Sequence, residues 1–155
     1  MPRTLQSEIK QTRPFATLEQ EALLSIARTA AVLEHSLAEA LKPFGVTGTQ
    51  YNALRILRGA GESGLCRNEV RERLIAQVPD VTRLLDRLEE MRLVVRGRDG
   101  DDRRLVTSRI TAEGKRLLAR MDEPVQAIHR RQLGHLGERK LRALIELLAA
   151  ARERP

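Results

Sequence analysis

The chain contains few aromatic residues. Its 155 residues include two phenylalanines, one tyrosine and no tryptophan. Proteins that bind single-stranded nucleic acid, and modules that recognise RNA sequence, stack bases on aromatic side chains. Phe15, Phe44 and Tyr51 are too scattered along the sequence to predict such a stacking surface. If the protein binds nucleic acid, duplex DNA is therefore favoured.

Cysteine and long apolar segments are also scarce. The single cysteine, Cys66, cannot form a disulfide within the chain and suits a reducing compartment. The N-terminal residues contain no apolar stretch of signal-peptide length, and no unbroken apolar run is long enough to span a membrane. We therefore expect a cytoplasmic protein with no membrane partner.

Motifs for catalysis and for metal binding are missing as well. The sequence has no nucleophile elbow, no glycine-rich phosphate loop and no plausible pair of catalytic carboxylates. His35, His129 and His135 are not spaced to place two metal ligands on one helix face. We expect no enzyme, no cofactor and no metal site.

Positive charge, in contrast, is in excess. The chain has 28 lysines and arginines against 21 acidic residues, a net charge of +7 and a pI near 10.6. A basic domain of this size favours a polyanionic partner, usually nucleic acid. An arginine-rich soluble protein without such a partner has the same balance, so charge leaves both interpretations open.

Capping residues mark where the first long helix begins. Residues 1–15 lack helical periodicity and are expected to form an N-terminal arm. Thr17 and Gln20 form a capping box that opens a helix with apolar residues on more than one side. Pro43 and Gly45 end this helix.

Three shorter helices are predicted next. A second capping box at Thr47 opens a helix that ends at the glycine-rich turn of residues 59–64. A short helix begins at Cys66, in a position where serine or threonine is usual. Pro79 is expected at the first position of the fourth helix, where proline is tolerated. The apolar residues of that helix recur at helical spacing: Val81, Leu84, Leu85, Leu88 and Met91.

The period then changes from helical to alternating. Residues 93–96 and 105–110 predict two strands, and seven of the nine residues 96–104 at their connection are charged. Two short helices joined by a tight turn and followed by a β-hairpin describe a winged helix-turn-helix.

Long helices flank this module. Thr111 caps a helix that we expect to be kinked or interrupted near Pro124, and Gly134 and Gly137 separate it from a final helix. The flanking helices carry more apolar surface than the small module covers, so we expect a homodimer.

The predicted fold class is mainly α with a small β-hairpin wing (α+β). The predicted organisation is an arm over 1–15, a first dimerisation helix over 16–45, a winged helix-turn-helix DNA-binding region over 46–111 and C-terminal dimerisation helices over 112–155.

The polar face of the fourth helix is a candidate DNA-binding surface. The residues on that face by helical spacing are Asp80, Thr82, Arg83, Asp86 and Arg87, of which Asp80, Thr82, Arg83 and Arg87 are the candidates for DNA contact. A recognition helix contacts base edges with its N-terminal residues, and arginine paired with guanine is the commonest specific contact. A solvated amphipathic helix has the same pattern.

The charged loop is the second candidate. Asp102 and Arg104 are two residues apart, so the carboxylate can fix the direction of the guanidinium. Arg98, Arg103 and Arg104 are then expected to reach a minor groove, whose negative potential attracts arginine. The alternative is a solvated hairpin without function.

The most distinctive part of the sequence is the segment 81–114. It contains the stretches VTRLLDRLE (81–89), LVVR (93–96), DRR (102–104) and ITAEG (110–114). Together they resemble the signature of the MarR family of dimeric winged helix-turn-helix transcription regulators, over roughly residues 17–152.

This resemblance carries implications for architecture and function. It implies a dimer built from the first and the last two helices, a palindromic operator, and repression that a small aromatic or phenolic ligand relieves. It assigns Thr82 and Arg83 to the recognition helix. It also implies that Asp102 pairs with Arg104 and that this arginine enters the minor groove.

Two positions depart from the pattern of the family. Arg92 stands where the family often has glycine, so the turn after the recognition helix is expected to differ locally. Cys66 replaces a capping serine or threonine, which makes a redox-sensing thiol one interpretation. A small half-buried residue is the favoured one, because thiol-sensing relatives carry their cysteine in the first helix.

Two further expectations concern ligands and partners. Arg28, Tyr51 and Arg55 are polar residues on otherwise apolar helices, so they are candidates for lining an effector cleft, although each can equally be an ordinary surface or core-edge side chain. The alternative to a regulator is a dimeric interaction module that has lost DNA binding and uses its arginines on a protein partner.

Overall fold

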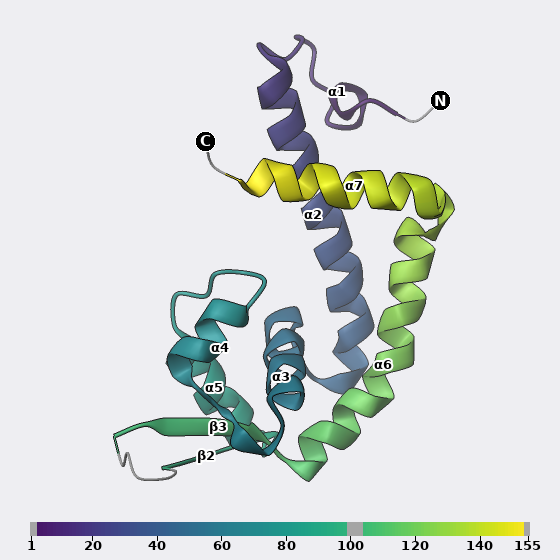
Figure 1. The fold of residues 1–155 in the computed structure, drawn as a ribbon. Coiled ribbons are helices and arrows are strands. Elements are labelled where there is room, and N and C mark those ends of the chain that lie inside the picture. The colour runs from purple at the N-terminus through teal and green to yellow at the C-terminus, as the bar shows by residue number, and fades with distance from the viewer. Residues whose placement is uncertain (1–2, 99–103, 154–155) are drawn as a thin grey trace.

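The helices and strands of the protein follow the predicted order (Figure 1). The computed structural model describes residues 3–98 and 104–153. The α-helices are α1 (Leu5–Glu8), α2 (Leu18–Leu41), α3 (Gly48–Ala60), α4 (Arg67–Arg73), α5 (Val81–Glu90), α6 (Ala112–Leu133) and α7 (Gly137–Arg152). The 3₁₀ helices are η1 (Lys42–Phe44), η2 (Gly61–Ser63) and η3 (Gly134–Leu136), and the strands are β1 (Leu65–Cys66), β2 (Val94–Arg98) and β3 (Val106–Ile110).

The winged helix-turn-helix is compact and the flanking helices extend from it. α3 packs against α2, α4, α6 and β3, and α5 packs against α4 and β2. α2 and α6 run alongside each other away from the module, and α7 follows α6 after the turn at η3 (Figure 1). This arrangement confirms the predicted fold class.

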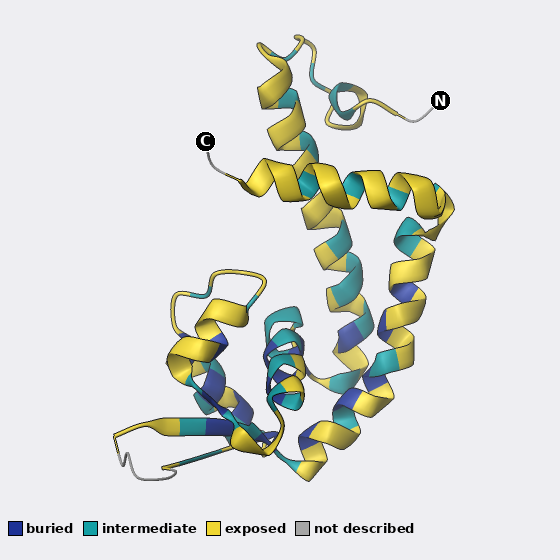
Figure 2. Cartoon of the chain, in the orientation of Figure 1, coloured by how far each residue is buried: buried dark blue, intermediate teal, exposed yellow. Residues whose placement is uncertain are grey.

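The hydrophobic core lies where the module meets the near ends of α2 and α6 (Figure 2). Its fully buried side chains include Leu41, Leu54, Leu57, Val70, Leu85, Leu88, Leu118 and Met121. Figure 2 shows that the far half of α2 and most of α7 are exposed. A single chain therefore buries the core of the module but leaves apolar side chains of its long helices exposed.

The predicted caps are present at three helices. Thr47 Oγ1 accepts from the Gln50 backbone N–H at 3.1 Å, and Gln50 Oε1 accepts from the Thr47 N–H at 2.9 Å, which completes the capping box. Thr17 and Thr111 cap α2 and α6 in the same way through their hydroxyl oxygens. Gln20, however, accepts from the N–H of Ala16, one residue earlier than expected.

The start of the recognition helix was predicted wrongly. α5 begins at Val81, and Asp80 is its N-cap, whose carboxylate accepts from the Arg83 N–H at 2.9 Å. Pro79 therefore precedes the cap and does not occupy the first helical position. The carboxylate of Asp80 accepts a hydrogen bond from a backbone N–H of the first turn, which the side chain of proline cannot do. Asp80 therefore takes the N-cap position, and the helix begins at the next residue.

Three further details differ from the prediction. The N-terminal arm contains the short helix α1, and α6 continues through Pro124 without interruption, although it bends along its length (Figure 1). β1, which the sequence did not predict, pairs antiparallel with β3 through Leu65 and Cys66. The sheet order is β1-β3-β2, so β3 is central.

α6 begins in close contact with the end of the recognition helix. A side chain at Gly114 would place its Cβ 2.5 Å from the carbonyl oxygen of Leu93. The Thr111 N–H donates to that same carbonyl at 3.0 Å. The absence of a side chain lets α6 start close against Leu93, the residue before β2.

The turn after α5 has an unusual residue at its centre. The N–H of Arg92 donates to Glu89 O at 2.9 Å and the N–H of Leu93 donates to Leu88 O at 3.0 Å, which together form a Schellman motif. Arg92 has φ +60°, in the left-handed region where glycine is favoured. The turn is therefore a regular Schellman motif, formed at the cost of backbone strain in an arginine.

This strain predicts a stabilising substitution. Arg92→Gly should raise the free energy of unfolding by about 1 kcal/mol, because relief of the left-handed strain exceeds the added chain entropy. Urea denaturation of both proteins at one concentration measures the effect. Arg92→Ala removes the same side chain and keeps the strain, so an equal gain in that variant would contradict the explanation.

Candidate nucleic-acid interface

The outer side of the recognition helix presents polar and basic residues to solvent. Thr82, Arg83 and Arg87 are exposed on α5, and we call these three residues the reading face. Asp80 holds the first turn of this helix as its N-cap. The α5 helix also buries Val81, Leu85 and Leu88 on its opposite side, which fixes the direction in which the reading face points.

Neighbouring side chains engage two members of the reading face. Arg67, the first residue of α4, donates from Nη1 to Thr82 Oγ1 at 3.3 Å. Arg87 pairs with Glu90 one turn later at 3.0 Å, with both side chains mostly exposed. The Arg87 pair is a weak surface contact, so phosphate can replace it at small cost.

The wing is described up to Arg98 and again from Arg104. Both of these arginines are exposed, Arg98 at the end of β2 and Arg104 just before β3. Asp102 and Arg103 lie outside the described residues, so the predicted pair of Asp102 with Arg104 stays a prediction. The strands bring Arg98 opposite Val106, which places both wing arginines at the same end of the sheet.

An arginine in β2 ties the wing to the recognition helix. Arg96 Nη2 lies 2.5 Å from an Asp86 carboxylate oxygen and 2.7 Å from Glu89. Glu89 also accepts from Arg96 Nε at 2.9 Å and from the Arg96 backbone N–H at 3.1 Å. These charge-assisted bonds hold the base of the wing against α5.

The contact with Arg96 changes the pKa of the Glu89 carboxylate. Hydrogen bonding from the Arg96 side chain lowers the pKa of Glu89 below its ordinary value of 4.5, against a smaller opposing effect of burial. The same bonds raise the pKa of Arg96. This cluster could not be predicted from the sequence, because residues seven apart and separated by a turn follow no local spacing rule.

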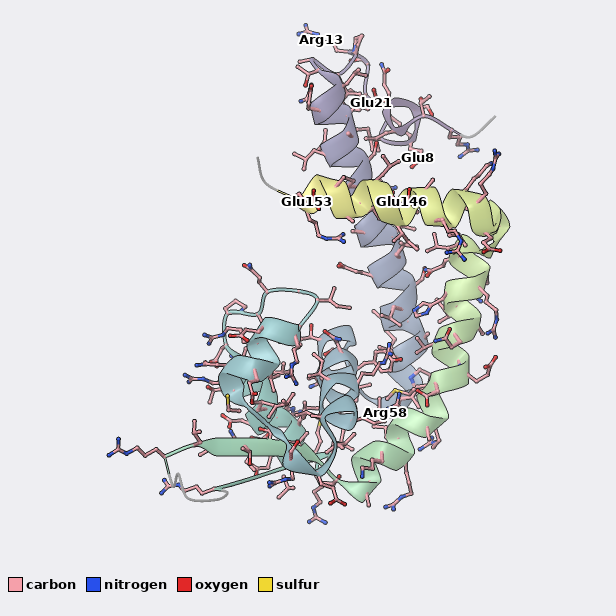
Figure 3. All side chains as sticks on the ribbon, in the orientation of Figure 1. Glu8, Arg13, Glu21, Arg58, Glu146 and Glu153 are labelled. Atoms are coloured by element: carbon pink, nitrogen blue, oxygen red, sulfur yellow. The ribbon has the colours of Figure 1, made fainter. Side chains whose placement is uncertain are left out.

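A second arginine–carboxylate pair joins α3 to the long helix α6. Arg58 on α3 donates two bonds to the carboxylate of Asp122 on α6, at 2.9 and 3.0 Å. Figure 3 shows Arg58 where α3 faces α6. These bonds lower the pKa of Asp122. The pair connects α3 to α6 and could not be predicted from the sequence either, since 64 residues separate its members.

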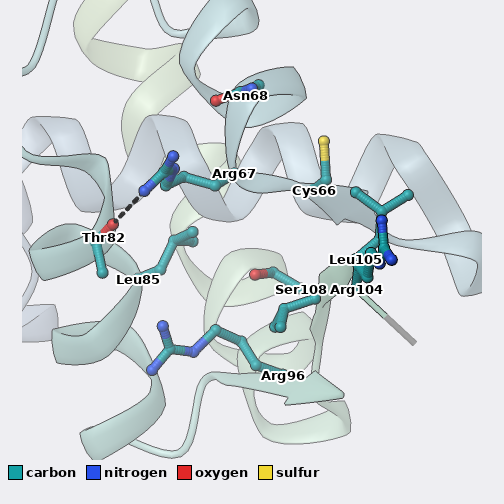
Figure 4. Close-up of a pocket in the computed structure, with 10 residues that line it drawn as sticks. Cys66, Arg67, Asn68, Thr82, Leu85, Arg96, Arg104, Leu105 and Ser108 are labelled. Atoms are coloured by element: carbon teal, nitrogen blue, oxygen red, sulfur yellow. Dashed lines mark hydrogen bonds between the residues drawn. The ribbon is translucent and has the colours of Figure 1, made fainter. Parts of the chain in front are cut away.

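A pocket opens between α4, α5 and the wing (Figure 4). It has a volume of about 390 Å³. Its lining combines three arginines with apolar and hydroxyl groups: Cys66, Arg67, Asn68, Thr82, Leu85, Arg96, Arg104, Leu105, Val106 and Ser108. We call it the wing pocket.

A second, shallower pocket lies on the other side of α5. It has a volume of about 580 Å³ and is lined by Thr49, Ala76, Gln77, Val78, Pro79, Asp80, Arg83, Leu84 and Arg87. We call it the loop pocket, because the α4–α5 connection forms one wall. The two pockets flank the recognition helix, so a molecule bound in either one would contact the reading face.

The residues expected at an effector cleft are not gathered at these pockets. Tyr51 is buried on α3, with the Arg55 guanidinium carbon 6.0 Å from its ring centroid. Arg28 is exposed on α2. None of the three lines the wing pocket or the loop pocket. Tyr51 and Arg55 contact each other, as a core-edge pair does.

Cys66 is half-buried and forms the N-cap of α4. Its backbone N–H donates to Glu69 Oε2 at 2.8 Å, and this bond is the main cause of a lowered pKa for Glu69. The helix start therefore keeps the reciprocal half of a capping box. The residue also lines the wing pocket next to Arg67.

Within residues 3–98 and 104–153, no three histidine, cysteine or acidic side chains gather in a way that could hold a metal ion. Over the same ranges, no helix combines the length and the apolar character that crossing a bilayer requires.

Comparison with known proteins decides the family. A model of the MarR family matches residues 44–105, from η1 to the wing. A MarR transcription factor from Planctomyces limnophilus is 39% identical in a match that covers 88% of this chain and 99% of that chain, with a TM-score of 0.67. The chain belongs to the MarR family. It is therefore a winged-helix transcription regulator and not an enzyme.

More distant MarR-like structures share the fold. MepR of S. aureus, solved as a DNA complex, is 21% identical with a TM-score of 0.74, and the match covers 89% of this chain and 97% of MepR. BpsR of Bordetella bronchiseptica, whose DNA binding is regulated by 6-hydroxynicotinic acid, is 20% identical with a TM-score of 0.76, over 86% and 99% of the two chains. No curated protein matches this MarR-family chain.

The contact between Glu89 and Arg96 predicts a pH-dependent loss of stability. The folded state lowers the pKa of Glu89, so the contact stabilises fully above pH 4.5 and is lost as the pH falls toward the lowered value. Glu89→Gln should cost about 1 kcal/mol at pH 7. The deficit should shrink below about pH 4.5, as urea denaturation at several pH values would measure.

A neighbouring variant provides the control. Glu90→Gln removes one negative charge from the same helix but breaks only the exposed contact with Arg87. Its stability at pH 7 should stay close to that of the wild type. A pH-independent deficit in Glu89→Gln would contradict the electrostatic explanation.

Proposed function

We propose that this MarR-family regulator is a homodimeric, cytoplasmic repressor that binds a palindromic operator in duplex DNA. The observation that carries the proposal is the position of the reading face. Thr82 and Arg83 are exposed in the first turn of α5, next to the wing and at a fixed angle to it through Arg96. A recognition helix contacts base edges with this part of its length.

The two DNA-contacting elements suit different grooves. α5 enters the major groove, where Arg83 pairs with guanine and Arg87 reaches a phosphate. Arg98 and Arg104 extend from the wing toward the adjacent minor groove, where Arg103, which lies outside the described residues, is expected to join them. In a symmetric dimer the second α5 enters the next major groove on the same side of the duplex, so the operator is palindromic.

Uncovered apolar surface supports the dimer. Large apolar side chains are exposed along the far part of α2 and on α7: Leu18, Leu23, Leu24, Ile26, Val32, Ile145 and Leu147. A patch of this kind on helices that the module does not cover fits a second copy of the chain.

A small aromatic or phenolic effector would release the DNA. BpsR, a relative by fold, has its DNA binding regulated by 6-hydroxynicotinic acid, a small aromatic compound. To act in the same way, the effector must prefer the dimer geometry in which the two reading faces no longer match successive major grooves. Arg28, Tyr51 and Arg55 stay candidates for contacts with it.

Two alternatives are tested by the same DNA complex. The first is a repressor switched by oxidation of Cys66, which lies half-buried beside Arg67 of the wing pocket. Peroxide or alkylation would then change the affinity for DNA. The second is an interaction module without a DNA target, which would show a shallow salt dependence with random DNA.

The first test is an affinity titration with the DNA that flanks the coding region of the protein. Two chains should bind one site, and this DNA should exceed random DNA in affinity by at least about a thousandfold. Repeating the titration at several salt concentrations separates phosphate contacts from base contacts. Equal affinity for both DNAs at every salt concentration would contradict an operator in this region.

Two substitutions separate the base contact of Arg83 in the major groove from the contact of Arg104 with the minor groove. Arg83→Ala should cost about 1–3 kcal/mol of binding and relax the preference at one base pair in each half-site. Arg104→Ala should weaken binding to all sequences with little change in major-groove preference. Unchanged affinity in Arg104→Ala would identify the wing as a solvated hairpin.

The exposed apolar helices predict the oligomeric state. Sedimentation should show a dimer for the wild type and a monomer for the double variant Leu23→Glu with Ile145→Glu, because buried charges oppose association. Ile75→Glu is the control, since Ile75 is 90% exposed in the α4–α5 connection. This control should remain dimeric, and a double variant that also remains dimeric would refute the assigned interface.

A further inference from the structure

Arg67 is a basic residue outside the recognition helix that contacts it directly. It is exposed at the first position of α4, and its guanidinium reaches across the mouth of the wing pocket to Thr82 on α5 (Figure 4). The Nη1 atom donates to Thr82 Oγ1 at 3.3 Å. Within residues 3–98 and 104–153, Arg67 forms no ion pair with an acidic residue.

The hydroxyl of Thr82 can act both as a donor and as an acceptor. It carries one O–H and two lone pairs, whereas a guanidinium has donors and no acceptor. The bond from Arg67 therefore occupies a lone pair of Oγ1 and cannot satisfy the hydroxyl proton. In the described part of the chain the Thr82 hydroxyl donates to no acceptor.

This geometry gives Thr82 a defined hydrogen-bonding character toward DNA. With a lone pair held by Arg67 on the pocket side, the hydroxyl proton is directed away from that donor and toward the exposed side of α5. Thr82 then offers a donor to whatever faces the helix. The second lone pair of Oγ1 stays open, but a hydroxyl that already accepts from a guanidinium is polarised toward donating, so accepting again from a base is the weaker arrangement.

The four bases differ in whether they present an acceptor to a hydrogen-bond donor in the major groove. In the major groove guanine presents N7 and O6, thymine presents O4 and adenine presents N7 as acceptors. Cytosine presents the N4 amino group, which is a donor without a neighbouring acceptor. A hydroxyl that is polarised toward donating therefore disfavours cytosine at the base that it faces.

We propose that Arg67 is a positioning residue that fixes the Thr82 hydroxyl as a hydrogen-bond donor and so disfavours cytosine at one position in each half of the DNA site. The proposal rests on the proposed function, because it requires the reading face to contact bases. It adds a determinant of sequence preference that lies outside the recognition helix. The remaining N–H groups of Arg67 also stay available for a neighbouring phosphate.

The test is selection from a duplex library of random sequence, followed by affinity measurements on the selected site with each of the four bases at every position. The wild type should disfavour cytosine at one position by about fivefold to tenfold, the range that one hydrogen bond supplies. Arg67→Met keeps the aliphatic stem without the donors, and should reduce that discrimination to below about twofold.

Changes at Thr82 show whether Arg67 acts through it. Thr82→Val should remove the same discrimination, and Arg67→Met should have no further effect on base preference in that background. Thr82→Ser keeps the hydroxyl and should retain the rejection of cytosine as long as Arg67 is present. Thermal melting of each variant verifies that the domain is folded.

A matched control separates positioning from loss of charge. Arg73→Met removes one exposed arginine from the same helix and should leave the base preference as in the wild type. If Arg67→Met weakens binding to all sequences equally and still disfavours cytosine, Arg67 contacts a phosphate and the inference is wrong. If the wild type selects no sequence at all, the proposed function and this inference both fail.

Discussion

The contact of Arg96 with Asp86 and Glu89 is the constraint on which the DNA-binding surface depends. A winged helix-turn-helix presents two unlike elements, a helix and a hairpin, and duplex DNA accepts them only at a fixed separation. Arg96 is in the hairpin and both carboxylates are in the helix, with distances of 2.5 and 2.7 Å. Because these groups are partly shielded from solvent, their attraction is screened less than that of an exposed pair.

The apolar side chains of the protein fall into two groups, one buried in the core of the module and one exposed on the long helices. The core of the module is complete within one chain, as the full burial of Leu54, Leu57 and Leu88 shows. α2 and α7 instead expose leucines and isoleucines that this core does not reach. The Arg58–Asp122 pair joins the two parts, so a movement of the long helices has a direct physical connection to the DNA-binding region.

Local sequence rules predicted most elements and failed where two rules competed. Thr47 and Thr111 were identified as caps because their partners are three residues away. At the start of α5, Pro79 and Asp80 both favour a helix start, and the carboxylate took the capping position. Pro124 was expected to kink or interrupt α6; the helix is not interrupted, and it buries Met121 and Val125 on either side of the proline.

By itself, the sequence determined the order of elements, the helix caps and the residues of the reading face, because each depends on neighbours within one or two turns. It also carried the resemblance to the MarR family. Only the tertiary structure decided which polar and charged groups meet across elements. The bonds from Arg67 to Thr82, from Arg96 to Glu89 and from Arg58 to Asp122 join different elements. Their partners are set by how those elements pack, and no periodicity along the chain encodes that packing.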